Sequence, residues 1–357
     1  MVQRSAMHSA HAKHQQQGLS LVELMVAMVI ALLVVWAATA VYLHSASQQR
    51  AQERRSTAQE AGALAMDLLG RDILNAGFYP ASFASSTVDV SQAGGYDSYP
   101  PLESAVRKDS DWQNQAQGWP PLAYRAGVYG CDGGEFNVQT ASCPAADASQ
   151  PDSLVVNYFS ADAMGDSGSR KDCTGSAVDN DPSNKYRTNA GKKLNQPPLQ
   201  PLFVSNRYAL RDLKNFVDQQ DMATKSLVCS GNGMSAFGNP GIYQPMVAGF
   251  KDMRFRYGVY SSAAATFPDR FYSAAEVSAM PAVGINGQAY TGWQRVSAVK
   301  VCILIQSQGS AVRLESSAGQ AMRYLDCDDR PQTLPAGQWV QRLVQVFGVR
   351  NALQQSY

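Results

Sequence analysis

A long apolar stretch near the N-terminus contains one acidic residue close to its start. Between Leu19 and Leu43 the clearly polar side chains are Ser20, Glu23, Thr39 and Tyr42. A helix over this range, at ~1.5 Å per residue, can cross a hydrocarbon core of about 30 Å. Because an ionised carboxylate inside a bilayer costs roughly 3 kcal/mol or more, Glu23 needs a partner, a special location or a function.

Three kinds of N-terminal segment have such an apolar pattern. A secretory signal peptide would have a shorter core, although "ATA" (Ala38 to Ala40) offers a cleavage site. An ordinary membrane anchor explains the length of the stretch but leaves Glu23 unexplained. Cleavage after Gly18 would instead create an α-amino group on Leu19. In a bundle of such helices, that cation could meet the Glu23 carboxylate of a neighbour and fix the axial register of the assembly.

The short basic leader that ends at Gly18, followed by "LSLVELMVAMVIALLVV", resembles the class III signal of type IV pilins and related pseudopilins. The resemblance implies that a prepilin peptidase cleaves after Gly18 and methylates Leu19. It also implies that Glu23, at the fifth mature position, acts in assembly. The usual first mature residue is phenylalanine, and Leu19 is a departure that the family tolerates. We therefore expect a leader in residues 1–18 and a transmembrane helix segment in residues 19–43.

Helical sequence continues beyond the apolar stretch. Residues 44–77 are rich in the helix formers Ala, Gln, Glu, Arg and Leu, and Gly77 and Pro80 are typical of a helix end. Apolar residues recur at helical spacing, which predicts an amphipathic half that packs on its own domain. These residues are Ala58, Ala61, Ala65, Leu68, Leu69 and Ile73. One helix is therefore expected from Leu19 to about residue 76.

The segment "MDLLGRDILNAGFYP" (66–80) narrows the resemblance to the PilW-type minor pilins, and it is similar to the usually smaller J-type minor pseudopilins of type II secretion. Residues 78–357 are expected to form a β-rich periplasmic domain. Alternating or β-branched runs predict strands within it. These runs are 152–160, 253–259, 295–307 and 338–351. The expected fold class is α+β, with a long N-terminal helix packed on a mainly antiparallel sheet in a loop-rich, disulfide-stapled domain.

Six cysteines follow the apolar stretch, and no CxxC spacing occurs among them. Export to an oxidising periplasm makes disulfides their expected use. Pairing in chain order joins Cys131 to Cys143, Cys173 to Cys229 and Cys302 to Cys327, although the spacing leaves the other pairings open.

The distribution of histidines argues against an enzyme. They are His8, His11, His14 and His44, so the region beyond residue 44 has no histidine to serve as a catalytic base or a metal ligand. "GDSG" (165–168) lacks a base, "SAVK" (297–300) lies on a predicted strand, and "DNDPSNK" (179–185) lacks the turn glycine of a calcium loop. The formal charge of +1 gives no global basic field. Arg254 and Arg256 could contact phosphates in DNA uptake, which stays open, but a solvated strand face is the favoured interpretation. No catalytic residue, metal, cofactor or nucleic acid is expected.

The resemblance implies a minor pilin that primes type IV pilus assembly near the pilus tip, in twitching motility and cell adhesion. Its expected partners are other minor pilins, the major pilin, a tip adhesin and the prepilin peptidase. Before assembly it would span the inner membrane once, with a cytoplasmic N-terminus and a periplasmic domain, and afterwards it would lie in the pilus at the cell surface. Arg4 and Lys13, which precede the apolar stretch, favour a cytoplasmic N-terminus, but Arg50, Arg54 and Arg55 on its other side weaken this charge argument. The six cysteines beyond the stretch support the same orientation, because disulfides form in the periplasm. The alternatives are a J-type pseudopilin and a membrane-anchored periplasmic binding protein or enzyme.

Overall fold

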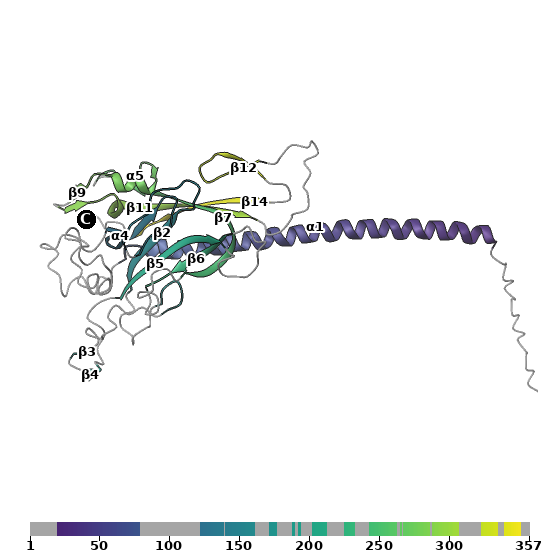
Figure 1. The fold of residues 1–357 in the computed structure, drawn as a ribbon, viewed down its shortest axis with the longest axis horizontal. Helices are drawn as coiled ribbons and strands as arrows, with labels where there is room; N and C mark the ends of the chain where they lie inside the picture. The colour runs from purple at the N-terminus through teal and green to yellow at the C-terminus, as the bar shows by residue number, and fades with distance from the viewer. Residues whose placement is uncertain are drawn as a thin grey trace, which may run out of the picture. The chain divides into compact units, whose positions relative to one another are not determined.

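The computed structural model describes residues 20–78, 122–138, 140–160, 171–176, 188–189, 192–193, 202–212, 225–232, 243–262, 265, 267–285, 288–306, 323–334 and 339–350. The chain divides into two compact units, Met1–Glu53 and Arg54–Tyr357. Helix α1 (Leu21–Asn75) contributes residues to both units (Figure 1).

Helix α1 is 55 residues long, in close agreement with the expected range. Its end follows from a glycine. Gly77 has a φ of 71°, a left-handed conformation that a residue with a side chain adopts only at a cost. The Gly77 N–H then donates to the carbonyl of Asn157 on a strand (2.8 Å), so the chain leaves the helix already bonded to the sheet.

The remaining elements are short helices and strands. The helices are α4 (Leu122–Arg125), α5 (Ala274–Ala279) and the 3₁₀-helix η5 (Trp293–Arg295). The strands of the main sheet are β1 (Val128–Cys131), β2 (Ser153–Ser160), β5 (Leu202–Asp212), β6 (Lys225–Ser230), β7 (Gln244–Val259), β8 (Phe271–Tyr272), β11 (Val296–Gln306) and β14 (Val340–Gly348). The remaining strands form three small pairs: β3 (Thr188–Asn189) with β4 (Lys192–Lys193), β9 (Val283–Ile285) with β10 (Gln288–Tyr290), and β12 (Arg323–Leu325) with β13 (Pro331–Thr333).

Among the described residues, the main sheet has eight strands in the order β1-β2-β5-β6-β7-β11-β14, with β8 paired to β7. Every one of these pairings is antiparallel, which confirms the α+β class and the antiparallel sheet. The four predicted strands correspond to β2, β7, β11 and β14. The sequence analysis did not predict the other four strands of this sheet, β1, β5, β6 and β8.

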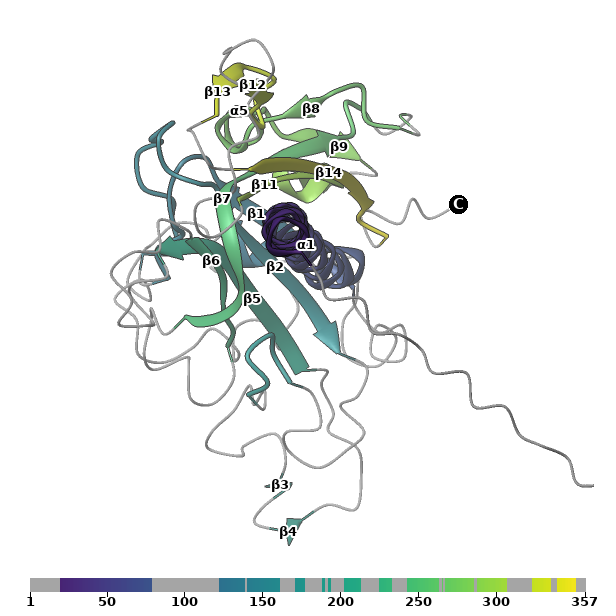
Figure 2. The same ribbon diagram turned by 90° about the vertical axis from the view of Figure 1, so that its right-hand side faces the viewer.

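The core lies between the sheet and the C-terminal half of α1. Figure 2, which looks along α1, shows the sheet curving around this part of the helix. Ala65, Leu69 and Ile73 are fully buried there, which confirms the predicted apolar stripe. Glycine fits positions 62 and 70 because β14 approaches the helix closely there. A Cβ on Gly62 would collide with Leu343, and one on Gly70 would collide with the ring of Phe347.

The opposite face of the sheet is covered by a smaller core and by a hairpin. Ala123, Tyr124, Phe136 and Val155 pack together over β1 and β2. The β12–β13 hairpin lies over β7 and β11, where the Arg256 guanidinium donates to Asp328 at 2.6 Å. On β7, the Lys251 ammonium also lies over the ring of Tyr324 of this hairpin, 4.9 Å from its centroid.

Three disulfides hold these coverings in place, which confirms the expectation of a disulfide-stapled domain. Cys131 pairs with Cys143, Cys173 with Cys229 and Cys302 with Cys327, with Cα atoms 5.3, 6.3 and 5.7 Å apart. This is the pairing in chain order. The Cys302–Cys327 bridge ties the β12–β13 hairpin to β11, and the Cys131–Cys143 bridge ties the turn after β1 to that strand.

Candidate functional site

The first turn of α1 contains a reciprocal pair of hydrogen bonds around Glu23. The Ser20 N–H donates to the Glu23 carboxylate (2.9 Å), and the Glu23 N–H donates to the Ser20 hydroxyl (3.3 Å). This is a capping box, which satisfies two of the four N–H groups left without partners at a helix start. Gly18 and Leu19, the expected cleavage and methylation positions, lie outside the described residues.

The capping box holds the Glu23 carboxylate at the N-terminal end of the helix. Its acceptor oxygen sits on the amide of Ser20, the residue that follows Leu19 in the chain. A carboxylate is favourable at this end because of the partial positive charge of the helix dipole. Glu23 is therefore fixed next to the position where cleavage after Gly18 would create an α-amino group.

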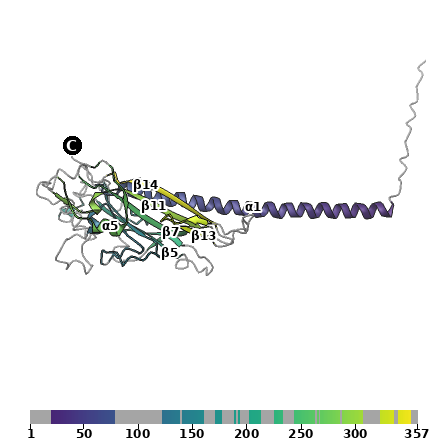
Figure 3. The same ribbon diagram turned by 90° about the horizontal axis from the view of Figure 1, so that it is seen from above.

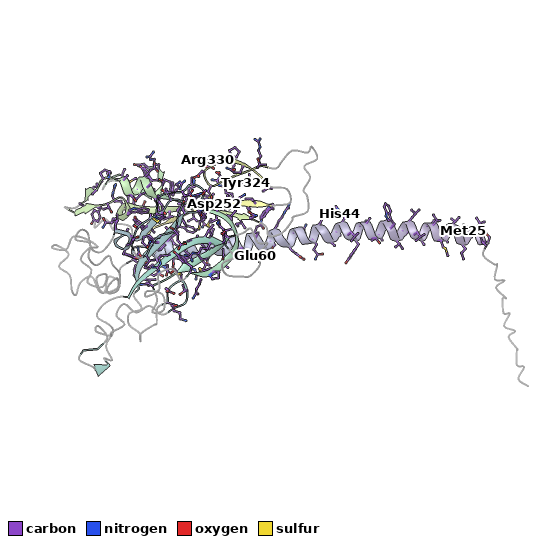
Figure 4. All side chains as sticks on the ribbon, in the orientation of Figure 1. Met25, His44, Glu60, Asp252, Tyr324 and Arg330 are labelled. Atoms are coloured by element: carbon purple, nitrogen blue, oxygen red, sulfur yellow. A yellow bond between two sulfur atoms is a disulfide. The ribbon has the colours of Figure 1, made fainter. Side chains whose placement is uncertain are left out.

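Beyond this turn, α1 presents apolar side chains around its circumference. The most apolar part of Leu21–Ala46 has a mean hydropathy of 2.7, and none of that part is buried. Met25 and His44 mark the two ends of this surface and project from the helix (Figure 4). A helix that is apolar all round is stable in a membrane or in a bundle of similar helices, so length and composition suggest a membrane anchor.

An acidic residue anchors the C-terminal half of α1 to the sheet. Asp72 accepts hydrogen bonds from the side-chain amide of Asn206 (2.6 Å) and from the hydroxyls of Tyr208 (2.7 Å) and Tyr158 (3.4 Å). These partners lie on β2 and β5. Burial, followed by the negative charge of Asp72, raises the pKa of the Tyr208 hydroxyl well above its ordinary value. Tyr208 therefore stays protonated and donates to Asp72 over the whole physiological pH range.

A second charged cluster ties the turn after β1 to β7. Asp152 is almost fully buried and accepts from the N–H groups of Gly133 (2.8 Å) and Phe255 (2.9 Å). The Arg254 guanidinium lies 3.0 Å from Asp152 and 3.1 Å from Asp252. Arg254 and Arg256 are thus engaged by acids of the same domain, which argues against the phosphate contact that the sequence analysis considered for them.

Three segments of the sequence resemble catalytic or calcium-binding motifs, and the one that lies among the described residues does not form such a site. Ser297 is buried on β11 and its hydroxyl donates to the carbonyl of Gly258 (3.3 Å), while Lys300 lies three residues on and hence on the opposite face. The "GDSG" and "DNDPSNK" segments lie outside the described residues. Within the described ranges, no group of three or more His, Cys, Asp or Glu side chains has the geometry of a metal site.

Sequence reasoning missed two polar residues that position α1. Ser20 had a readable signal, because Ser-x-x-Glu before an apolar run is the spacing of a capping box. The sequence signal for Asp72 was weaker. Asp72 lies between the core residues Leu69 and Ile73, on a helix face where a charged side chain requires a partner. The partners Asn206 and Tyr208 come from β5, which was itself unpredicted.

Family models match two parts of the chain. Residues 13–39 match the prokaryotic N-terminal methylation motif, which includes Gly18, Leu19 and Glu23. Residues 215–351 match the family described as Type IV Pilus-assembly protein W. The chain is a type IV pilin-like protein with a PilW domain. In this PilW-type chain the matched region runs from the segment before β6 to the end of β14, and so includes the two strands that contact Gly62 and Gly70 of α1.

Comparison with solved structures gives a match of low similarity. The type IV-like pilin TTHA1219 from Thermus thermophilus matches with a TM-score of 0.28 and 11% identity, over 58% of this chain and 81% of that chain. Among the curated proteins, none matches. Membership of the pilin family implies processing through the N-methylation motif and association with other pilus components, and pilins are structural proteins rather than enzymes.

Proposed function

We propose that this PilW-type chain is a minor pilin that is cleaved after Gly18, methylated on Leu19 and inserted near the tip of a type IV pilus, where it helps to prime assembly. The observation that carries the proposal is the coincidence of three features in one turn. A prepilin motif, an apolar exposed helix and a carboxylate held at the helix start all meet at Ser20–Glu23.

Glu23 would change partners during assembly. In the single chain its carboxylate accepts from the Ser20 N–H. In a bundle, the α-amino group of a neighbouring Leu19 offers a full positive charge, and a buried pair of opposite charges is far better than either charge alone. This change of partner favours assembly only when the neighbouring helix lies at one axial position. The charge pair would therefore also fix the axial register between subunits.

The protein would act as a structural subunit rather than an enzyme. Its partners would be other minor pilins, the major pilin, a tip adhesin and the prepilin peptidase. It would enter the inner membrane as a single-pass protein with the disulfide-bonded domain in the periplasm, and then move into the pilus. The three disulfides support this location, because such bonds persist in oxidising compartments.

A J-type pseudopilin of type II secretion is the second candidate, since the helix and its motif fit it equally. The match to the pilus-assembly family favours the pilus. Neighbouring genes distinguish the two, because a minor pilin would be encoded with pilus genes and a pseudopilin with secretion genes.

Mass spectrometry of the N-terminal peptide tests the processing. We expect a methylated peptide that begins at Leu19. Removal of Arg4 and Lys13 leaves 28 basic and 29 acidic residues, so the formal charge changes from +1 to −1. A chain that begins at Val41 would mean cleavage by an ordinary signal peptidase and would rule out the pilin function.

Two substitutions separate the capping role of Glu23 from its charge. Glu23→Gln keeps a side-chain oxygen that accepts from Ser20 but removes the negative charge, whereas Glu23→Ala removes both. We expect both variants to be cleaved and retained in the membrane, and both to be lost from sheared pili. Normal incorporation of Glu23→Gln would show that no charge pair forms at this residue.

A further inference from the structure

Strand β14 is the last strand of the main sheet, and one of its edges is open. Among the residues that the structure describes, β14 pairs only with β11. The Val349 N–H donates to the carbonyl of Ser297 on the β11 side (2.7 Å), and the register continues without a shift along β14. Because alternate residues of an antiparallel strand direct their main-chain groups to opposite sides, those of Arg342, Val344 and Val346 face the open edge.

Within the described part of the chain, this edge lacks the usual protection against pairing with another strand. Residues 343–348 ("LVQVFG") contain no charge and no proline, and the side chains of Val344 and Val346 are 43% and 52% exposed. Natural sheets block such edges with lysine, proline, bulges or a covering element. An uncharged, β-branched edge of this kind is a template for a further strand.

The opposite edge of the same sheet is protected. Strand β1 has only four residues, and the Cys131–Cys143 bridge folds the following turn back to it. Helix α5 lies against β1, and its first N–H groups donate to Asp132 at 3.0 and 2.7 Å. The two edges therefore differ, and β14 is the one that the described residues leave available for pairing.

A groove beside the open edge has room for side chains. It has a volume of about 450 Å³ and lies between α1 and β14. Ala63, Met66 and Gly70 form the apolar part of its helix wall, beside the ion pair of Asp67 and Arg71. Leu343, Gln345 and Phe347 form its sheet wall. A strand added to β14 would direct every second side chain into this mainly apolar groove, as the pleat requires.

The direction of β14 restricts what can pair with it. Gly62 of α1 lies against Leu343, and Gly70 lies against Phe347, so β14 runs in the same direction as this part of α1 (Figure 3). An antiparallel pair of two β14 strands would therefore place the two α1 segments in opposite directions. In the bundle of parallel helices that the proposed function requires, two copies would not form that pair, which disfavours a second copy as the partner.

We propose that the open edge of β14 binds an extended strand of a different pilus subunit. The strand has an uncharged centre that matches residues 343–348, and it carries an acidic side chain that meets Arg350, which is exposed just beyond the end of β14. Main-chain hydrogen bonds provide the affinity, and the groove selects apolar side chains at alternate positions. The pilus subunit as source of the strand rests on the proposed function.

Proline at position 346 tests the edge without breaking the sheet. Val346→Pro removes an N–H that faces the open edge and leaves the bonds to β11 intact. We expect leader cleavage and thermal stability close to wild type, and incorporation into sheared pili reduced about tenfold. Val346→Thr, which keeps the N–H and the β-branched shape, is the matched control. Val344→Lys provides a second variant, because an edge lysine opposes strand pairing while leaving the monomer folded.

Photo-crosslinking identifies the occupant. A photoreactive phenylalanine at position 346 of the full chain should crosslink to a strand of another pilin-like subunit, whereas the same group at Leu325, on the β12–β13 hairpin, should not. Crosslinks to a second copy, or to residues 351–357 of the same chain, would overturn the proposal. Normal incorporation of Val346→Pro and Val344→Lys would overturn it as well. Absence of the wild-type chain from pili would instead refute the proposed function.

Discussion

Substitution of Asp72 measures how strongly its hydrogen bonds hold α1 to the sheet. Asp72→Ala would leave the Asn206 amide and the Tyr208 hydroxyl without their acceptor, and both partners are at least 98% buried. An unsatisfied buried donor costs ~1–3 kcal/mol. Because Asp72 itself is only half-buried, water can replace part of the lost bonding, and we expect a total loss of about 3 kcal/mol in the free energy of unfolding.

Three further variants isolate the hydrogen bonds. Asp72→Asn keeps one acceptor oxygen and should lose ~1–2 kcal/mol. Tyr208→Phe combined with Asp72→Ala should show a coupling of about 1 kcal/mol, because the two residues share a bond. Asp67→Ala is the matched control on the same helix. Its ion pair with Arg71 spans 3.4 Å between side chains that are more than 60% exposed, and its loss should cost ~0.5 kcal/mol or less.

The assay is urea unfolding of the full chain in detergent, followed by near-ultraviolet circular dichroism. The signal reports the buried aromatic cluster around Trp293, whose ring centroid lies 4.8 Å from that of Tyr257. If Asp72→Ala were no more destabilised than Asp67→Ala, the hydrogen bonds of Asp72 would not hold the helix to the sheet. Apolar packing of Leu69 and Ile73 would then be sufficient.

Three other predictions follow from the fold. Thiol alkylation of the exported chain should label none of the six cysteines before reduction and all six afterwards, and full labelling of the native form would refute the disulfides. Stability should fall as the pH rises above about 10, by ~1.4 kcal/mol per pH unit for each buried tyrosine, because the folded-state pKa of Tyr208 and Tyr257 is raised and only the unfolded chain can ionise them. Alkaline unfolding of Tyr208→Phe should show a smaller slope. Gly70→Ala should cost ~1–3 kcal/mol by pressing on the ring of Phe347, and Phe347→Leu should restore part of that loss; an additive double variant would contradict the contact.

The sequence predicted the elements whose residues repeat with a clear period. Helix α1 is apolar at helical spacing, and strands β2, β7, β11 and β14 are β-branched or alternating, so local pattern was sufficient for them. Strand β5 ("LFVSNRYALRD") was missed because its two faces serve different purposes. Tyr208 faces α1 and bonds Asp72, whereas Arg207 is buried on the other face and donates to Ser230, so polar and apolar residues follow each other without a period.

The same reasoning explains which candidate functional residues were visible in the sequence. Glu23 was singled out because a charge in an apolar helix conflicts with its surroundings whatever the tertiary structure. The role of Asp72 depends on Asn206 and Tyr208, more than 130 residues away in the chain, and no local pattern reports such contacts. The open edge of β14 is visible only once the strand order is known.

The two halves of α1 solve the same problem by different means. The sheet buries Ala65, Leu69 and Ile73 within the single chain, so this half of the helix has its partner as soon as the domain folds. The surface from Leu21 to Ala46 has none of its most apolar part buried, and lipid or neighbouring helices must cover it. A surface without partners in the monomer gives no preferred position to a neighbour, because apolar contacts lack direction. A charge pair does have one position of lowest energy, so the pair that we propose for Glu23 would set the register of an assembly that apolar packing holds together.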